Sequence, residues 1–192
     1  MISVGIDEVG RGCWAGPLVA GAVILPDLEV GPIDSLLKLR DSKKLSKKQR
    51  SRLDAAIRDQ ASAIGLGWVT PKEIDDVGLS AAVKLAMERA FAEIAIGYDE
   101  IIIDGNINYF AGNPKAQAVI RADDRVPSVS AASIVAKVAR DKYMSELQGK
   151  YAGYGFETHV GYGTAAHIAA LKRLGVSDIH RRSYKPIKAF LA

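Results

Sequence analysis

The chain has 192 residues, of which 48% are hydrophobic and 25% charged, and its formal net charge is +4. This length fits one globular domain, and no apolar run reaches the roughly 20 residues that a membrane span requires. A single cysteine excludes an internal disulfide and a thiolate-rich metal centre. Because the first residues also lack the basic lead and long apolar stretch of a secretory signal, we expect a protein of the reducing cytoplasm.

The predicted elements alternate between short apolar strands and amphipathic helices. Strands are predicted at residues 2–6, 18–25, 65–69, 101–103 and 118–120, and the last two are wholly apolar, as in strands buried on both faces. Helices are predicted after capping boxes at Ser46 and Thr70, then over 80–96, 131–147 and 164–174, with a short one near the C-terminus. This order predicts an α/β fold with a mixed sheet, which has a hairpin on one side and parallel strands on the other.

Positive charge is concentrated in two segments. Residues 38–52 contain eight Lys or Arg and one acid, Asp41, and residues 172–188 contain six more Lys or Arg. Such clusters are either solvated faces or the electrostatic footprint of a phosphate backbone. The charge distribution alone leaves both interpretations open.

Acidic residues follow three of the predicted strands. Asp7 and Glu8 come after the first strand, Asp104 after the fourth, and Asp123 and Asp124 two residues after the fifth. Each could belong to an ordinary turn or loop, but a charge at the end of a core strand is unfavourable unless it is solvated, paired or metal-bound. Ligands of open α/β sheets also bind at strand ends. Together the acids predict an all-oxygen site for Mg²⁺ or Mn²⁺, and two such ions can hold both reacting oxygens of a phosphodiester.

Other cofactor chemistry is less favoured by the sequence. The chain has only three histidines, which makes zinc and histidine acid–base catalysis less attractive. It contains neither a phosphate-binding P-loop nor a dinucleotide-binding glycine motif after a strand. The acids therefore remain the main candidates for chemistry.

Several distinct short motifs lie along the chain from residue 5 to about residue 187. They are GIDEVGRG (5–12) with AGP (15–17), DSKKL (41–45), IDGN (103–106), SAASIVAKVARD (130–141), YGF (154–156) with HVGY (159–162), and HRRS (180–183). In this order and spacing they resemble ribonuclease HII. The resemblance implies a ribonuclease H-like fold with a five-stranded mixed sheet flanked by helices. It also implies a single catalytic domain over residues 1–192, with a helical C-terminal part from about residue 140.

The resemblance further implies the catalytic residues and the reaction. The catalytic metal ligands would be Asp7, Glu8, Asp104 and Asp123. Asp123 is preferred to Asp124 because Ala122 and Asp123 match a Gly-Asp pair of the family. The implied cofactor is two ions of Mg²⁺ or Mn²⁺. The implied reaction is hydrolysis of the RNA strand of RNA–DNA hybrids and a cut 5′ of ribonucleotides embedded in duplex DNA, which leaves 3′-hydroxyl and 5′-phosphate ends.

Substrate-binding residues are implied by the same motifs. They would be Gly10, Arg11, Gly12, Ser42, Lys43, Lys44, Tyr162, Arg181 and Arg182. The glycines would let the backbone approach the ribose 2′-OH, and Tyr162 would pack on the sugar at the junction. The basic residues and Ser42 would contact phosphate oxygens. A tight turn, a half-buried aromatic and a helix cap are the corresponding structural alternatives.

Three departures from the family pattern concern substrate affinity more than catalysis. Ala122 replaces a glycine, Val160 replaces a lysine, and Cys13 and Trp14 form an unusual pair after Gly-Arg-Gly. Two other functions stay open. Another ribonuclease H-like nuclease, such as a junction resolvase, would share the acids but not Gly-Arg-Gly with Tyr162. A catalytically silent nucleic-acid-binding protein would need no metal. We expect a bacterial or archaeal monomer that does not act at a membrane.

Overall fold

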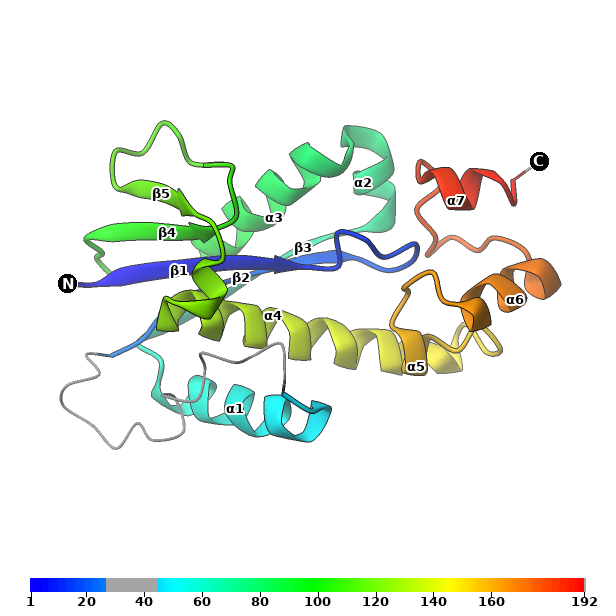
Figure 1. The fold of residues 1–192 in the computed structure, drawn as a ribbon, viewed down its shortest axis with the longest axis horizontal. Coiled ribbons are helices and arrows are strands. Elements are labelled where there is room, and N and C mark those ends of the chain that lie inside the picture. The colour runs from blue at the N-terminus through cyan, green and yellow to red at the C-terminus, as the bar shows by residue number, and fades with distance from the viewer. Residues whose placement is uncertain (27–44, 192) are drawn as a thin grey trace.

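The structure is a computed structural model, and it describes residues 1–26 and 45–191. Within these residues, five strands form one sheet in the order β3-β2-β1-β4-β5 (Figure 1). They are β1 (Ser3–Val9), β2 (Leu18–Ile24), β3 (Ala63–Val69), β4 (Glu100–Asp104) and β5 (Ala116–Val119). β2 pairs antiparallel with both β1 and β3, whereas β4 pairs parallel with β1 and β5. The predicted mixed sheet is thus confirmed.

Helices cover both faces of the sheet. One face carries α2 (Pro71–Val77) and α3 (Leu79–Ala92), and the other carries α4 (Pro127–Glu146) with α1 (Lys47–Gln60) outside it (Figure 1). The capping boxes predicted at Ser46 and Thr70 are both present. The short helices α5 (Phe156–His159), α6 (Ala165–Leu174) and α7 (Lys185–Lys188) gather beyond the C-terminal part of α4, and the 3₁₀ helices η2 (Ala122–Asp124) and η3 (Leu147–Gly149) flank α4 in the sequence.

Glycines let the helices lie directly on the sheet. A Cβ atom at Gly5 would lie less than 3.0 Å from the backbone of Ser128 in α4, and one at Gly21 would lie 2.5 Å from the carbonyl oxygen of Ala132. On the opposite face, a Cβ at Gly67 would collide with the backbone of Ala86 in α3. Since any larger residue would push a helix away, these contacts hold α3 and α4 in fixed positions against the strands.

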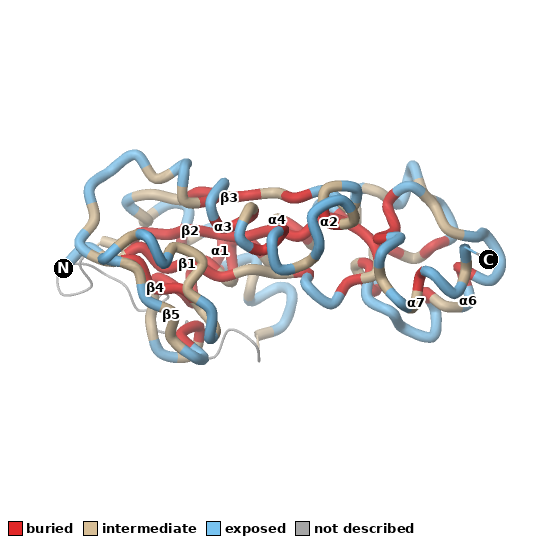
Figure 2. The backbone as a smooth tube through the Cα atoms, turned by 90° about the horizontal axis from the view of Figure 1, so that it is seen from above, coloured by how far each residue is buried: buried red, intermediate tan, exposed pale blue. Residues whose placement is uncertain are grey.

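The core has three main parts. One lies between the sheet and α3, and a second between the sheet, α4 and α1. A third, around Phe156, Leu171 and Ile187, joins the C-terminal helices to Met144 of α4 and to Ala15 of the loop after β1. Figure 2 shows buried backbone along β1 and β2, with mainly exposed backbone at the outer side of α6 and α7. No helix of the described residues is long and apolar enough to cross a bilayer.

Several predicted boundaries differ from the structure, and α3 ends at Ala92 instead of the predicted residue 96. α4 begins four residues earlier than predicted, at Pro127, since proline is well tolerated in a first helical turn. β1 continues through Asp7 and Glu8 instead of ending before them. The prediction that residues 118–120 form a strand buried on both faces is wrong. β5 is an edge strand with one neighbour, and Ile120 beyond its end is 63% exposed.

Candidate active site

Three aspartates from separate segments converge beside the sheet. One carboxylate oxygen each of Asp7, Asp104 and Asp123 lies within 4.8 Å of the others. β1 pairs with β4 only as far as Ile6, whereas it stays paired with β2 through Val9. Asp7 therefore lies where the edge of β1 that faces β4 is open, next to the end of β4 that carries Asp104.

The loop that carries Asp123 is tied to Asp104. The Oδ1 atom of Asp104 accepts hydrogen bonds from the backbone N–H groups of Ala122 (2.8 Å) and Asp123 (3.4 Å). Ala122 is fully buried, and the left-handed backbone of this loop falls on Arg121 before it, where φ is 57°. Alanine therefore fits at position 122 without the freedom of glycine. Asp124 forms an ion pair with Arg121 at 2.7 Å and is not part of the three-aspartate group.

Glu8 lies beside this group but outside it. Its side chain is 10% exposed and accepts a hydrogen bond of 3.1 Å from Arg11. Glu8 lines the same cavity as the three aspartates. Of the four predicted ligands, the structure thus brings three within ligand distance of one another and puts the fourth at their side.

Burial and neighbouring carboxylates disfavour negative charge on the acids of this site. Burial raises the pKa of the Asp7 carboxyl well above its usual value, and the charges of Glu8 and Asp104 raise it further. A hydrogen bond with Ser133 acts in the opposite direction. Burial also raises the pKa of Glu8, although the charge of Arg11 lowers it. A bound cation would relieve this repulsion.

The cavity around the acids has a volume of about 440 Å³. Its walls come from β1, the loop after it, β4, η2, α1, α4 and Tyr162. The lining residues are Asp7, Glu8, Val9, Gly10, Arg11, Gly12, Arg50, Asp104, Asp123, Ser133, Ile134, Lys137 and Tyr162. Sequence reasoning did not assign Arg50, Ser133 or Lys137 to the site. Ser133 and Lys137 are four residues apart and so share one face of α4, which was a usable signal.

The Gly-Arg-Gly segment has one glycine that faces inward and one that is open. Gly10 has φ of 92°, and a Cβ there would lie 2.5 Å from Nε of Arg140. Gly12 is exposed, and a Cβ there would meet nothing within 4 Å. The first glycine is thus required by internal packing, while the backbone at the second is accessible to a ligand.

Arg140 of α4 holds the loop after β1 in place through hydrogen bonds to backbone carbonyl groups. Its guanidinium is fully buried and donates to the carbonyl oxygens of Pro17 (2.8 Å), Val160 (2.9 Å) and Ala15 (3.1 Å). Val160, which departs from the family's lysine, has a left-handed φ of 45°. Through its bond to the Val160 carbonyl, Arg140 links this loop to the segment of residues 159–164, which we call the tyrosine turn.

Arg181 was expected to contact substrate, but it lies behind the loop. It is fully buried and donates to the carbonyl oxygens of Gly16 (3.0 Å) and Arg11 (3.1 Å) and to the Tyr184 hydroxyl (2.8 Å). Burial lowers its pKa. In this position its charge acts through the loop backbone and not on the surface.

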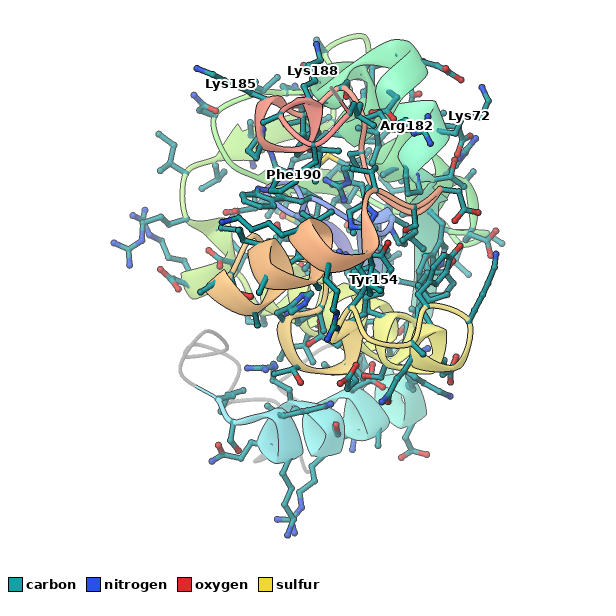
Figure 3. The ribbon with its side chains drawn as sticks, turned by 90° about the vertical axis from the view of Figure 1, so that its right-hand side faces the viewer. Lys72, Tyr154, Arg182, Lys185, Lys188 and Phe190 are labelled. Carbon is teal, nitrogen blue, oxygen red and sulfur yellow. The ribbon has the colours of Figure 1, made fainter. Side chains whose placement is uncertain are left out.

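Arg182 is exposed but does not line the cavity. Its backbone N–H donates to Asp75 at 2.8 Å, and Figure 3 shows it at the end of the molecule that also carries Lys72, Lys185 and Lys188. The other predicted phosphate contacts, Ser42, Lys43 and Lys44, lie outside the described residues.

Tyr162 stands at the edge of the cavity and is 39% exposed. Lys137 Nζ lies 5.8 Å from its ring centroid and also pairs with Asp141 at 2.8 Å. Cys13 is fully buried and forms a hydrogen bond with the tyrosine side chain. Burial, followed by the contact with Cys13, raises the pKa of Tyr162. The Cys13 departure thus lies directly against the predicted sugar-binding residue.

Comparisons with known proteins point to one family. The sequence profile of the ribonuclease HII family matches residues 4–187. The chain is 46% identical over 187 residues to ribonuclease HII of Dichelobacter nodosus, covering 97% of this chain and 96% of that one. The fold is similar to ribonuclease H2 from Pyrococcus horikoshii (TM-score 0.83, 29% identity, 99% and 97% coverage). It is also similar to a structure described as the PCNA:RNase HII complex from Archaeoglobus fulgidus (TM-score 0.77, 28% identity, 96% of each chain).

Proposed function

The chain belongs to the ribonuclease HII family of metal-dependent endoribonucleases, and we propose that it cuts on the 5′ side of ribonucleotides embedded in duplex DNA and within RNA–DNA hybrids. The products would carry 3′-hydroxyl and 5′-phosphate ends. One observation carries the proposal: Asp7, Asp104 and Asp123 converge in the same cavity that Tyr162 borders.

The donor set suits a hard divalent cation. The clustered groups in the described part of the chain are carboxylates, and the raised pKa of Asp7 reflects repulsion that a cation would offset. We assign Asp7, Glu8, Asp104 and Asp123 to hold two ions of Mg²⁺ or Mn²⁺. When bound, such ions activate water and stabilise the charge on the leaving oxygen.

The protein's own residues prepare this site before substrate arrives. The hydrogen bond from Ser133 orients Asp7, and Asp104 anchors the Asp123 loop through two backbone amides. On the open side, Arg50 and Lys137 line the cavity and are suited to phosphate oxygens. The exposed backbone at Gly12 and the ring of Tyr162 would read the ribose, with Gly10 and Arg11 completing that loop.

The remaining contacts extend along the duplex. Ser42, Lys43 and Lys44 would bind phosphate, and Arg182 with the basic residues near it would meet the backbone farther from the cut. Arg181 supports this surface indirectly, through the carbonyl groups of the loop. We propose a cytoplasmic monomer, in keeping with one cysteine that is free and buried.

A cleavage assay tests the proposal. The purified protein, with Mg²⁺, Mn²⁺ or a chelator, is offered a DNA duplex with one ribonucleotide, an RNA–DNA hybrid, an all-DNA duplex and a four-way junction. We expect metal-dependent cleavage of the first two only, with the cut 5′ of the ribonucleotide. Cleavage of the junction but not the hybrid would favour a resolvase. Binding without cleavage under every metal would favour a silent nucleic-acid-binding protein.

A further inference from the structure

All three histidines of the chain lie in one buried cluster, in which His159 belongs to the tyrosine turn and the other two pack beside it. His159, His167 and His180 are 7%, 0% and 1% exposed. The rings of His159 and His167 stack at 4.4 Å between centroids, and Nε2 of His167 lies 3.0 Å from Nε2 of His180. None of them lines the acid cavity, so the chemistry described above leaves them without a role.

The backbone partners of His159 determine which of its ring nitrogens carries hydrogen. Nε2 faces the carbonyl oxygen of Tyr154 at 2.8 Å, and a carbonyl can only accept. Nδ1 faces the N–H of Gly161 at 3.2 Å, and an amide N–H can only donate. His159 is therefore neutral, with its hydrogen on Nε2.

The same reasoning orders the other two rings into a chain. Nδ1 of His167 faces the carbonyl oxygen of Tyr162 at 2.9 Å and must donate, which leaves its Nε2 as an acceptor for His180. Nδ1 of His180 in turn accepts from the N–H of Ser177 at 3.1 Å. Hydrogen bonds thus run in one direction, from Ser177 through His180 and His167 to Tyr162. A proton added to either ring would set two donors against each other. Independently of this geometry, burial lowers the pKa of both rings to about 4.

This chain of bonds ends on the backbone of the residue that borders the cavity. The Tyr162 carbonyl accepts from His167 and also from the N–H of Thr164 at 2.8 Å. One residue earlier, the carbonyl of Gly161 accepts from the N–H groups of Trp14 (2.8 Å) and Ala15 (3.2 Å) in the loop after β1. Polar contacts therefore hold the backbone on both sides of the Tyr162 side chain.

We propose that His159, His167 and His180 form a positioning network that holds Tyr162 at the cavity for recognition of the ribonucleotide. The histidines touch neither the acids nor the cavity, so they act through the tyrosine turn. This inference rests on the proposed function, because it assigns sugar recognition to Tyr162. It assigns a direction to each hydrogen bond, which a role as mere core packing does not require.

Matched amide variants test the direction of the bonds. The side-chain N–H of asparagine stands in for Nδ1 of histidine and that of glutamine for Nε2, so His167→Asn keeps the donor to Tyr162 and His167→Gln loses it. We expect kcat/KM on a single-ribonucleotide duplex to fall about tenfold in His167→Gln and to stay within about threefold of the parent in His167→Asn. Similarly, kcat/KM should be higher in His180→Gln than in His180→Asn, because only glutamine keeps the donor toward His167. Both variants of a pair lose one ring, so equal losses within each pair that track the melting temperature would overturn the proposal.

A double-mutant cycle separates this inference from the function on which it rests. In a Tyr162→Ala background, His167→Gln should add no further loss on the single-ribonucleotide duplex, because the group that it positions is gone. Full additivity would overturn the network. If Tyr162→Ala alone cleaves at the parent rate, the sugar-recognition role of Tyr162 is what fails.

Nitrogen NMR of the parent protein tests the same network without any substitution. At pH 7 we expect three neutral rings, with hydrogen on Nδ1 of His167 and on Nε2 of His159 and His180. Any other assignment of the three protons would overturn the proposal, whatever the activity of the variants.

Discussion

The acid end of the site and the tyrosine turn are built in opposite ways. At the acid end, burial and neighbouring carboxylates raise the pKa of Asp7, so like charges oppose one another until a cation binds. At the tyrosine turn, Arg140 and His167 point donors at carbonyl oxygens, and the backbone finds its partners within the chain. On the proposed function, the acid end is completed by a bound cation, whereas the tyrosine turn is held in place before any ligand binds. Substitutions at the acid end should therefore abolish cleavage without lowering stability, whereas substitutions at the tyrosine turn should give smaller losses that depend on the substrate.

Removal of an acid should give the largest effect on activity. Asp7→Asn or Asp104→Asn should reduce cleavage by more than about 100-fold, because each removes a charged ligand from a shared site. In metal-free buffer the melting temperature should stay equal or rise, since repulsion is relieved. Cleavage assays with Mg²⁺ or Mn²⁺ and thermal unfolding in chelator check both parts. Normal turnover by either variant would sink the assigned site.

The neighbouring aspartates of η2 supply a matched pair for the same test. Asp123→Asn should lower the cleavage rate by more than about 100-fold, whereas Asp124→Asn, whose ion pair with Arg121 is partly exposed, should change it by less than about threefold. Rates on one hybrid substrate are sufficient. The reverse ranking would show that the ligand of this loop has been misassigned.

At the tyrosine turn the expected losses are smaller and depend on the substrate. Tyr162→Phe should weaken transition-state binding by about 1–3 kcal/mol, the usual effect of an unmet polar partner, and Tyr162→Ala should weaken it further. Both losses should be greatest on a duplex with one ribonucleotide, because a long hybrid offers many registers. The ratio of kcat/KM on the two substrates measures this. An unchanged ratio in Tyr162→Ala would contradict recognition through one sugar.

Acid should affect the two ends with opposite sign. His167 and His180 have a pKa of about 4 in the fold, against about 6.5 in an unfolded chain, so the unfolded state binds more protons between these values. Their contribution to stability is present above pH 6.5 and is lost as the pH falls toward 4. Asp7, whose pKa is raised, changes stability in the other direction.

His180→Gln isolates the histidine part of this pH dependence. It removes one titrating ring but keeps a donor toward His167, and the groups that face this ring are His159, His167 and Asp178. Between pH 6.5 and 4.5 the melting temperature of the parent should fall by a few degrees more than that of the variant. Parallel curves for the two proteins would refute the predicted pH dependence.

Local patterns predicted the framework of the molecule well, because hydrophobic periodicity and capping boxes act over a few residues. The sheet, the capped starts of α1 and α2, and the placement of acids at strand ends all depend on such short-range signals. The strand predicted at residues 118–120 is present as β5, but its burial on both faces was predicted incorrectly, since apolar residues do not show whether a strand has one neighbour or two.

Contacts between distant segments were beyond local patterns. The charge of Arg181 suggested a surface contact, yet the two carbonyl oxygens that it contacts lie 165 and 170 positions away in the chain, in the loop after β1. The scarcity of histidine argued against zinc but could not indicate that all three rings meet. Their cluster forms only because α6 and the segment before α7 fold back on the tyrosine turn.

Helix α4 serves both ends of the site from a single rigid rod. Ser133 contacts Asp7, and Arg140 holds the loop carbonyls and the tyrosine turn, seven residues farther along the helix. At about 1.5 Å per residue this separation is roughly 10 Å, and the contact of Gly5 with the backbone of α4 prevents the rod from sliding. On the proposed function, the spacing along this one helix therefore sets the distance between the phosphodiester bond that is cut and the sugar that is recognised. One residue inserted between Ser133 and Arg140 would rotate the part of α4 that carries Arg140 by about 100° relative to Ser133. Sugar recognition would then no longer be aligned with the cleavage site.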